Sequence, residues 1–421
     1  MVDGKIEFEI VKQVVNEPAG RFWNIDLLVG FCREAVAFAK AHRASVGIDS
    51  WGVDHGFVDG SGQIVFGPVM YRDPSHLAKF EAYADRRHRL FELTGIAHQP
   101  FNTLYQLAAR IEEDPTLPQR AEWYVIPDLL GYLLTGVRRH EQTQSSTTQL
   151  MGLDGKWCEE AFQMVGWPLP SEQPQRCGGT IGDCDGVPVV SVASHDTGSA
   201  VLGIGTMIDG DAYLNVGTWA LLGVVLDKPC TNAAAEEGNW TNEWAQDGRI
   251  RFLKNIPGFY VVNRLHDELG VKASVGEWLA GRDRSFTGRF NPQDPSLYNP
   301  DSMPAAAGSI CSKEPVTEGQ WAEAALGSLV DCISSDLPRL EKAIGKPAKR
   351  IRVAGGGSRS AAFCQAFADA SGLACVAGPV EATVLGNLAM QFAATGEIEQ
   401  CDVASLVSNS IAFQQFQPEG E

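Results

Sequence analysis

Short apolar runs alternate with longer stretches of helical periodicity along the chain, and this alternation predicts an α/β fold. Turn residues separate the runs, and apolar positions recur every three or four residues in the longer stretches. The elements expected in the first half are a strand at Lys5–Val14, a helix at Leu27–His42, a short buried strand at Ser45–Ile48, a hairpin at His55–Phe66 turning at Asp59-Gly60, a helix at Pro127–Leu134 that ends before Gly136, and a strand at Val189–Ala193.

The second half repeats the alternation, with glycines at several points where an apolar run ends. We therefore predict two α/β domains, residues 1–205 and 206–421, joined by a hinge near residues 200–210. The elements expected in the second half are two strands within Tyr213–Val225 about a Gly217-Thr218 turn, a helix at Gln320–Ile344 interrupted at Pro338, a strand at Ile351–Ala354, a helix at Ala361–Ala370, a strand at Ala374–Ala377, and a helix from Thr383 to Ala394.

The charge balance narrows the classes of partner. The 421 residues contain 34 Lys and Arg against 52 Asp and Glu, so the formal net charge is −18. A surface this acidic repels nucleic-acid phosphates and anionic lipid, so we expect neither nucleic acid nor a membrane as a partner. The 10 cysteines form no C-x-x-C pair and no signal segment opens the chain, which predicts reduced thiols and a cytoplasmic protein. The sequence does not indicate an oligomeric state.

The segment Ser194-His195-Asp196-Thr197 follows an apolar strand and opens a helix. A carboxylate at the carboxyl end of a strand lies where α/β proteins place reactive groups. Asp196 can act there as a general base, with His195 and Thr197 hydrogen-bonding a substrate. The alternative is that Asp196 only caps the helix that follows.

Two glycine-containing turns in the second half are suited to phosphate. Gly217-Thr218 joins two expected strands, and Gly355-Gly356-Gly357 joins a strand to a helix. Glycines let a phosphate approach the backbone closely, and a helix N-terminus offers it free N–H groups. Neither turn has the spacing of a known dinucleotide or P-loop motif, so each can also be an ordinary tight turn.

Polar and aromatic residues are mixed in several other segments, as in sites that bind sugars. Aromatic faces cover sugar C–H groups, while amides and carboxylates take the hydroxyls. Each segment also has a structural reading, such as a core tryptophan with turn-forming aspartates. These segments are Ile48–Asp54 (IDSWGVD), Phe101–Gln106 (FNTLYQ), Asn239–Glu243 (NWTNE) and Lys254-Asn255.

Taken together and in this order, the motifs resemble the FGGY family of sugar kinases, of the actin/hexokinase/Hsp70 superfamily, and within it the rhamnulokinase branch. The resemblance runs from about residue 5 to 415. The motifs that carry it are IDSWGVD (Ile48–Asp54), YRD (Tyr71–Asp73), FNTLYQL (Phe101–Leu107), PDLLGYLLTG (Pro127–Gly136), STTQL (Ser146–Leu150), ASHDTGSA (Ala193–Ala200), GTWALLG (Gly217–Gly223), TNE (Thr241–Glu243), RFLKNIPG (Arg251–Gly258), VAGGGS (Val353–Ser358) and AGPVEATVLGN (Ala377–Asn387).

The resemblance implies two actin/hexokinase-like (ribonuclease H-like) domains with a cleft between them, the first binding sugar and the second ATP. It implies transfer of the γ-phosphate of ATP, with Mg²⁺, to the primary hydroxyl of a ketose, and the rhamnulokinase branch points to L-rhamnulose and its 1-phosphate. Asp196 is then the base that takes the hydroxyl proton. Gly52, His195, Asp196, Thr197 and Asn255 are implied at the sugar, and Thr218, Asn263, Gly355 and Gly356 at the nucleotide.

One family feature has no counterpart in the sequence. Family members begin with two strands joined by an Asp-x-Gly-x-x-Ser-type turn that holds the ATP phosphates and Mg²⁺, and nothing before Lys5 resembles it. Two strands and a turn need about 15–25 residues. We therefore expect the first domain to lack this N-terminal β-hairpin. Either Met1 is not the true start, which the intact downstream motifs favour, or the chain is a non-catalytic sugar- or nucleotide-binding member of the fold.

Overall fold

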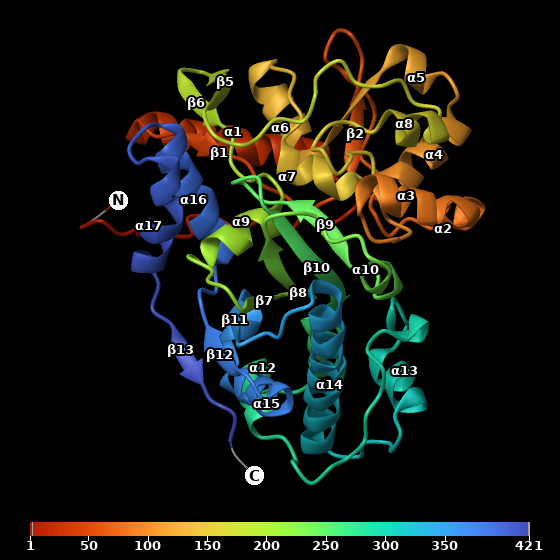
Figure 1. Cartoon of the computed structure of the whole chain (residues 1–421), viewed down its shortest axis with the longest axis vertical. Coiled ribbons are helices and arrows are strands. Elements are labelled where there is room, and N and C mark those ends of the chain that lie inside the picture. Colours follow the sequence, from red (N-terminus) through yellow and green to blue (C-terminus); the bar gives the residue numbers. More distant parts are fainter. Residues whose placement is uncertain (2, 420–421) are drawn as a thin grey trace.

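The structure is a computed structural model, and it describes residue 1 and residues 3–419. The chain forms two α/β lobes (Figure 1). In the described residues up to Gly203, the strands are β1 (Val46–Gly47), β2 (His55–Val58), β3 (Ile64–Phe66), β4 (Glu122–Val125), β5 (Thr180–Cys184) and β6 (Val187–Val190), and the helices are α1 (Ile25–His42), α2 (Ser75–Ala82), α3 (Arg87–Thr94), α4 (Thr103–Glu113), α5 (Leu117–Arg120), α6 (Ile126–Thr135), α7 (Gln142–Ser145), α8 (Glu159–Val165) and α9 (Asp196–Gly203).

The second lobe is built on one large mixed sheet, drawn in green and blue in Figure 1. Its described strands are β7 (Asp211–Val216), β8 (Trp219–Leu226), β9 (Thr241–Trp244), β10 (Ile250–Pro257), β11 (Arg350–Ala354), β12 (Ala374–Ala377) and β13 (Gln414–Phe416). The helices after Gly203 are α10 (Ala233–Glu237), α11 (Phe259–Glu268), α12 (Val275–Ala280), α13 (Met303–Ile310), α14 (Glu318–Ile344), α15 (Ala361–Ser371), α16 (Ala382–Ala394) and α17 (Val403–Ser410).

The strand order determines which loops lie together. The large sheet has the order β13-β12-β11-β7-β8-β10-β9, with β7, β11 and β12 parallel. The first lobe has two small sheets, β1-β6-β5 and β3-β2-β4, and β1 pairs with β6 in parallel. Loops after parallel strands leave a sheet at the same edge, so the loops after β1 and β6 are neighbours, and so are those after β7 and β11.

Most of the predicted elements are confirmed, including the first helix, the hairpin of β2 and β3, α6, the pair β7 and β8, and β12 with α16. Gly136 ends α6 in the left-handed conformation, with φ 71°. The strand expected at Val189–Ala193 ends at Val190. The chain division at residue 205 stays a prediction, although α16 and α17 lie beyond it and pack Leu385 and Val407 against Val190 and Leu202 of the first lobe.

Two predicted elements are wrong. No residue of Ile6–Pro18 lies in a strand, although the apolar alternation at Lys5–Val14 suits one. A strand also needs a neighbouring strand for its backbone groups, whereas the N–H of Ile6 donates to Ser410 Oγ at 2.8 Å. Helix α14 also continues through Pro338 without interruption. Leu337 and Leu340 on either side of this proline are buried in the core of the second lobe, which holds the helix together.

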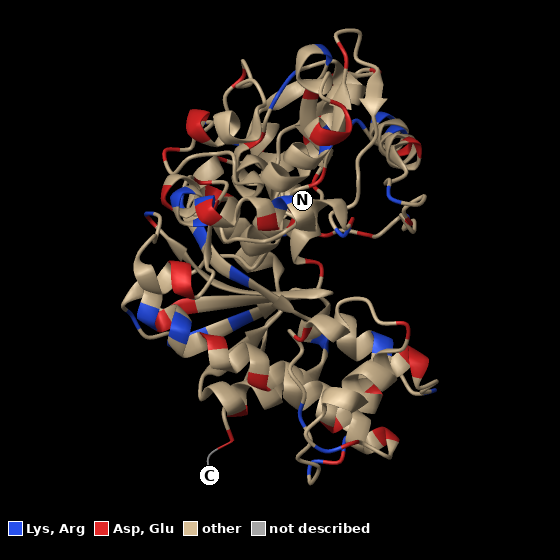
Figure 2. Cartoon of the chain, turned by 90° about the vertical axis from the view of Figure 1, so that its right-hand side faces the viewer, with Lys and Arg blue, Asp and Glu red and all other residues tan. Residues whose placement is uncertain are grey.

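Charges of both signs are present in both lobes (Figure 2).

The strands of the large sheet carry mainly apolar residues, and the core beneath them includes Trp240 stacked on Phe252 with ring centroids 5.5 Å apart. No helix of the described chain is long and apolar enough to cross a membrane.

Candidate active site

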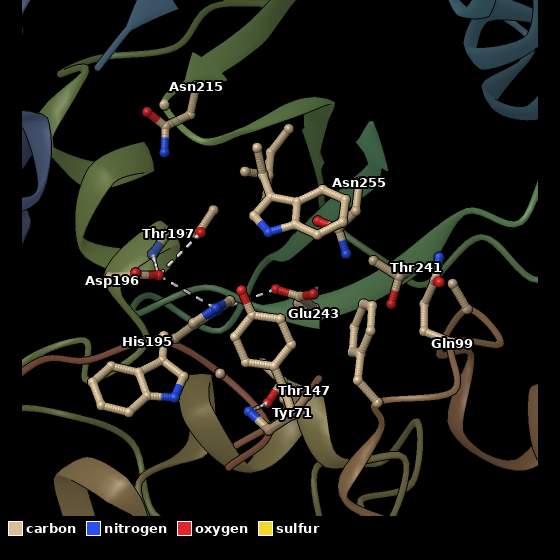
Figure 3. Close-up of a pocket in the computed structure, with 18 of the residues that line it drawn as sticks. Tyr71, Gln99, Thr147, His195, Asp196, Thr197, Asn215, Thr241, Glu243 and Asn255 are labelled. Atoms are coloured by element: carbon tan, nitrogen blue, oxygen red, sulfur yellow. Dashed lines mark hydrogen bonds and ion pairs between the residues drawn. The ribbon is translucent and has the colours of Figure 1, made fainter. Parts of the chain in front are cut away.

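A cavity of about 390 Å³ lies between the two lobes and receives residues from both (Figure 3). In this view Asp196 and Thr197 lie at one side and Gln99 at the other. Seven of the nine residues singled out from the sequence line it: Gly52, His195, Asp196, Thr197, Thr218, Asn255 and Gly355.

The other two residues lie elsewhere. Gly356 follows Gly355 in the loop after β11 and does not line the cavity. Asn263 is exposed on α11 and is not part of the cavity wall. In the described structure, all of the residues implied at the sugar therefore line the cavity. Of those implied at the nucleotide, only Thr218 and Gly355 do.

The backbone around Asp196 is fixed by the strand ends of the first lobe. The N–H of Ser50 donates to the carbonyl of Ser194 at 2.9 Å, and the N–H of Asp196 donates to the carbonyl of Ser50 at 2.8 Å. The buried carboxylate of Glu141 accepts from the N–H of Ser194 at 3.2 Å and from its hydroxyl at 2.8 Å. The loop that carries Asp196 is thus held from two sides.

Helix α9, which Asp196 opens, is held by unusually close packing on α16. A Cβ on Gly203 would lie 1.8 Å from the carbonyl oxygen of Ala382, and a Cβ on Gly386 would lie 1.9 Å from that of Ser199. Glycine is therefore required at both positions. In addition, the Thr383 hydroxyl donates to the Asp196 carbonyl at 3.3 Å.

The carboxylate of Asp196 faces the cavity, and only one of its two oxygens accepts hydrogen bonds from the described residues. Oδ1 accepts from the backbone N–H of Thr197 at 2.6 Å and from its hydroxyl at 3.2 Å. Oδ2 accepts no hydrogen bond from the described residues, and 44% of the side chain is exposed. His195 occupies the N-cap position of α9, so Asp196 is not the cap of this helix.

Asp54, the last carboxylate of the IDSWGVD segment, organises one wall of the cavity. Its Oδ2 accepts from Trp23 Nε1 at 2.6 Å, from Trp51 Nε1 at 2.9 Å and from the N–H of Tyr71 at 3.2 Å. Gln106 donates to Oδ1 at 2.9 Å. Burial raises the pKa of the Asp54 carboxyl to about 6, and these hydrogen bonds oppose the rise. Trp51 and Tyr71 both line the cavity.

Asp49, the first carboxylate of that segment, follows β1 and accepts a hydrogen bond from Asn387 of α16. Burial raises its pKa to about 7; the Asn387 hydrogen bond opposes the rise and the charge of Asp196 adds to it. The Asp196 carboxylate is therefore close enough to Asp49 to act on the ionisation of Asp49.

The two glycine turns of the second lobe lie side by side. Strands β7 and β11 are parallel, with Asn215 opposite Ala354, so the Gly217-Thr218 turn and the loop at Gly355 leave the same edge of the sheet. Gly355 has φ +78°, and a Cβ there would lie 2.8 Å from both Asn215 Oδ1 and the carbonyl oxygen of Val216. Thr218 and Gly355 both line the cavity.

Several cavity residues were not singled out as site residues from the sequence. Thr241 and Glu243 belong to the TNE motif and Thr147 to STTQL, so the motifs contained a signal. Thr383 likewise belongs to the AGPVEATVLGN motif, whereas no signal distinguished Asn215 from other polar residues. Those five residues all line the cavity. Among residues 1 and 3–419, no three His, Cys, Asp or Glu side chains gather as a metal-binding group.

The chain is similar in sequence to known carbohydrate kinases. Residues 212–395 match the model of the C-terminal domain of the FGGY family of carbohydrate kinases. The chain is 36% identical over 418 residues to a rhamnulokinase of Yersinia pestis (strain Pestoides F), covering 94% of this chain and 86% of that protein.

Solved structures of sugar kinases share the fold. The ligand-bound xylulose kinase of Lactobacillus acidophilus superimposes with a TM-score of 0.82 at 15% identity, covering 100% of this chain and 90% of that one. Plasmodium falciparum glycerol kinase with ADP gives a TM-score of 0.79 at 15% identity, covering 97% and 88%. The expected two-domain sugar-kinase fold is confirmed.

Proposed function

The chain is a carbohydrate kinase of the FGGY family, and we propose that it transfers the γ-phosphate of ATP to the primary hydroxyl of L-rhamnulose, giving L-rhamnulose 1-phosphate. The observation that carries this proposal is that Asp196 and Thr218, one from each lobe, line the same cavity. The similarity to a rhamnulokinase supports the choice of sugar.

Phosphoryl transfer demands positioning and charge stabilisation more than covalent chemistry. In the proposed complex the sugar lies against Gly52, His195, Thr197 and Asn255, with its primary hydroxyl at the free Oδ2 of Asp196. That oxygen accepts the hydroxyl proton as the hydroxyl oxygen bonds to the γ-phosphorus and the bond from this phosphorus to the β-phosphate oxygen breaks, releasing ADP. Asp196 is the first residue of α9, so its carboxylate lies at the positive end of the helix dipole.

The nucleotide is proposed at the opposite wall, with its phosphates at Thr218 and its nucleoside toward Gly355 and Gly356. The backbone at these two glycines supports this placement. Gly355 leaves no room for a Cβ, and a Cβ built on Gly356 would have no atom within 4 Å. Mg²⁺ is proposed to accompany ATP, where it would neutralise phosphate charge. Magnesium needs only one or two protein carboxylates when phosphates supply other ligands, so the lack of a larger acidic group among the described residues is compatible with it.

A substrate panel tests the proposed sugar. The rate of ADP formation would be measured with L-rhamnulose, with its C4 epimer L-fuculose, and with L-fructose, which carries a hydroxyl in place of a hydrogen on C6. We expect the highest kcat/KM with L-rhamnulose, and phosphorus NMR should place the product phosphate on C1. A higher kcat/KM with either of the other ketoses would contradict the proposed substrate. Sugar binding without ADP formation would favour the second candidate, a non-catalytic sugar-binding protein of this fold.

A further inference from the structure

A buried ion pair lies directly behind His195, in the second lobe. Arg251 on β10 and Glu243 on β9 face each other in the antiparallel register. Arg251 Nη2 lies 3.1 Å from Glu243 Oε2, and the two side chains are 0% and 7% exposed. Arg251 Nε also donates to the carbonyl of Trp244 at 3.2 Å, which fixes the plane of the guanidinium. Although burial opposes ionisation, Arg251 holds the pKa of Glu243 below its usual value.

The His195 ring stands between this pair and Asp196. Its Nδ1 lies 3.2 Å from Arg251 Nη2 and 3.3 Å from Glu243 Oε2. Its Nε2 lies 3.5 Å from Asp196 Oδ1. Figure 3 shows Glu243, His195 and Asp196 in that order across the cavity.

The backbone and the ring of His195 are held by different lobes. The N–H of His195 donates to Thr143 Oγ1 at 3.2 Å, and the residue forms a parallel bridge with Ser50, both in the first lobe. The ring contacts Arg251 and Glu243 of the second lobe. The orientation of the ring therefore depends on strands that lie outside the loop carrying Asp196.

The neighbours of the two ring nitrogens favour one tautomer. A guanidinium has only donors, so its hydrogen bond to Nδ1 requires a lone pair on that nitrogen. A neutral ring then carries its proton on Nε2, facing the Asp196 carboxylate. In the other tautomer Nδ1–H would donate to Glu243 Oε2, 3.3 Å away, but the Arg251 hydrogen bond would be lost and a lone pair on Nε2 would face the oxygen of Asp196. In the Nε2–H tautomer the Nδ1 lone pair lies near the same Glu243 oxygen, and the Arg251 donor offsets that repulsion.

We infer that Arg251 is a positioning residue that holds His195 with its proton on Nε2, so that the ring donates toward Asp196 or a sugar oxygen during phosphoryl transfer. Glu243 keeps the Arg251 guanidinium in place and balances its buried charge. The tautomer itself follows from the contacts of this chain, whereas its catalytic consequence rests on the proposed kinase function.

Nitrogen-15 NMR of histidine-labelled protein tests the tautomer without any substrate, with His195→Asn used to assign the His195 signals. The wild-type protein should show His195 protonated on Nε2. Arg251→Met should shift the proton to Nδ1, where Glu243 accepts it. Glu243→Gln breaks the same ion pair but keeps the Arg251 donor, so it should retain the wild-type tautomer. An Nε2–H ring in Arg251→Met, or a shifted proton in Glu243→Gln, would overturn the inference.

Kinetics test the consequence. Arg251→Met should lower kcat about tenfold, the effect of one hydrogen bond to a charged group, with a smaller change in KM for the sugar. Asp211→Asn is the matched control, because it breaks the Arg350–Asp211 pair, which also faces across two strands of this sheet but lies outside the cavity lining. It should leave kcat unchanged. An unchanged kcat in Arg251→Met alongside a shifted proton would overturn the positioning role.

Removing one partner of a buried ion pair can prevent folding. The double variant R251M/E243L leaves no unpaired charge and serves if Arg251→Met does not fold. The His195 ring of this double variant should no longer carry its proton on Nε2 alone. A ring still protonated only on Nε2 would overturn the inference. If the wild-type protein shows no kinase activity, the proposed function fails while the NMR comparison still decides the tautomer.

Discussion

The α-carbon of Gly52 faces the His195 ring so closely that a Cβ at position 52 would lie 3.1 Å from Nε2. The same Cβ would lie 3.3 Å from Thr147 Oγ1. These distances are tighter than ordinary van der Waals contact, so an alanine would have to push the ring or the hydroxyl aside. Position 52 therefore controls the nitrogen that faces Asp196, although glycine itself offers no functional group.

Gly52→Ala should lower kcat/KM for the sugar about tenfold, because small displacements of a positioning group are costly in a preorganised site. Stability should change little, since the displaced ring borders a cavity. Steady-state kinetics and urea unfolding check both statements. Gly30→Ala is the control, as a Cβ on Gly30 of α1 meets no atom within 4 Å. Wild-type kcat/KM in Gly52→Ala would contradict the role given to His195.

Asp54→Ala should weaken both the fold and sugar binding. The substitution removes the acceptor for Trp23, Trp51 and Gln106, and each buried donor left unpaired costs about 1–3 kcal/mol. We expect the free energy of unfolding to fall by about 3 kcal/mol and KM for the sugar to rise as Trp51 loses its anchor. Urea unfolding and kinetics measure these changes. Asp59→Ala removes an acceptor for Ser61 and Gln63 in the turn between β2 and β3, outside the cavity lining, and should leave KM for the sugar unchanged. An unchanged KM in Asp54→Ala would show that the wall does not contact sugar.

Gly355→Ala and Gly356→Ala should differ sharply in their effect on ATP. Residue 355 has φ +78° and no room for a Cβ beside Asn215 and Val216, whereas a Cβ on residue 356 would meet nothing within 4 Å. We expect Gly355→Ala to raise KM for ATP at least about tenfold and Gly356→Ala to raise it much less. Equal effects of the two substitutions on KM for ATP would argue against the nucleotide lying along this loop.

Asp128→Asn should flatten the dependence of stability on pH. Burial raises the pKa of Asp128 to about 8, and the charge of Glu141 adds to the rise. Between the unfolded pKa of about 4 and the folded value, the native state holds a proton that the unfolded state releases. The free energy of unfolding therefore falls with rising pH, by up to about 1.4 kcal/mol per pH unit from this group. Urea unfolding between about pH 5 and pH 8 measures how the free energy of unfolding changes with pH in the wild-type protein and in Asp128→Asn. The same slope in both proteins would contradict the raised pKa of Asp128.

The sequence was most informative where one local rule decides the structure. Four apolar residues between turn signals identified β12, and proline and glycine placed the ends of α6. Lys5–Val14 failed because a strand depends on a partner as well as on alternation. Pro338 failed as a break because packing of the surrounding leucines outweighs a missing backbone hydrogen bond.

The residues of the site also divide into those that local sequence indicates and those that only tertiary packing brings together. His195, Asp196 and Thr197 could be singled out as cavity residues because they are consecutive in the sequence. Arg251 and Glu243 become neighbours of His195 only through the register of β9 and β10 and the packing of one lobe on the other. Asn263 lies outside the cavity, so its role at the nucleotide stays a prediction, as does the absence of an N-terminal hairpin.

The most direct test of the account is ADP formation by the 421-residue chain with ATP and Mg²⁺, measured with and without L-rhamnulose. It would be run beside Asp196→Asn, whose amide cannot accept the hydroxyl proton, with sugar binding followed by calorimetry. We expect sugar-dependent ADP formation from the wild-type chain, and bound sugar without ADP formation from Asp196→Asn. A folded wild-type chain that binds L-rhamnulose but forms no ADP, or an Asp196→Asn variant with the wild-type rate, would contradict the proposed function.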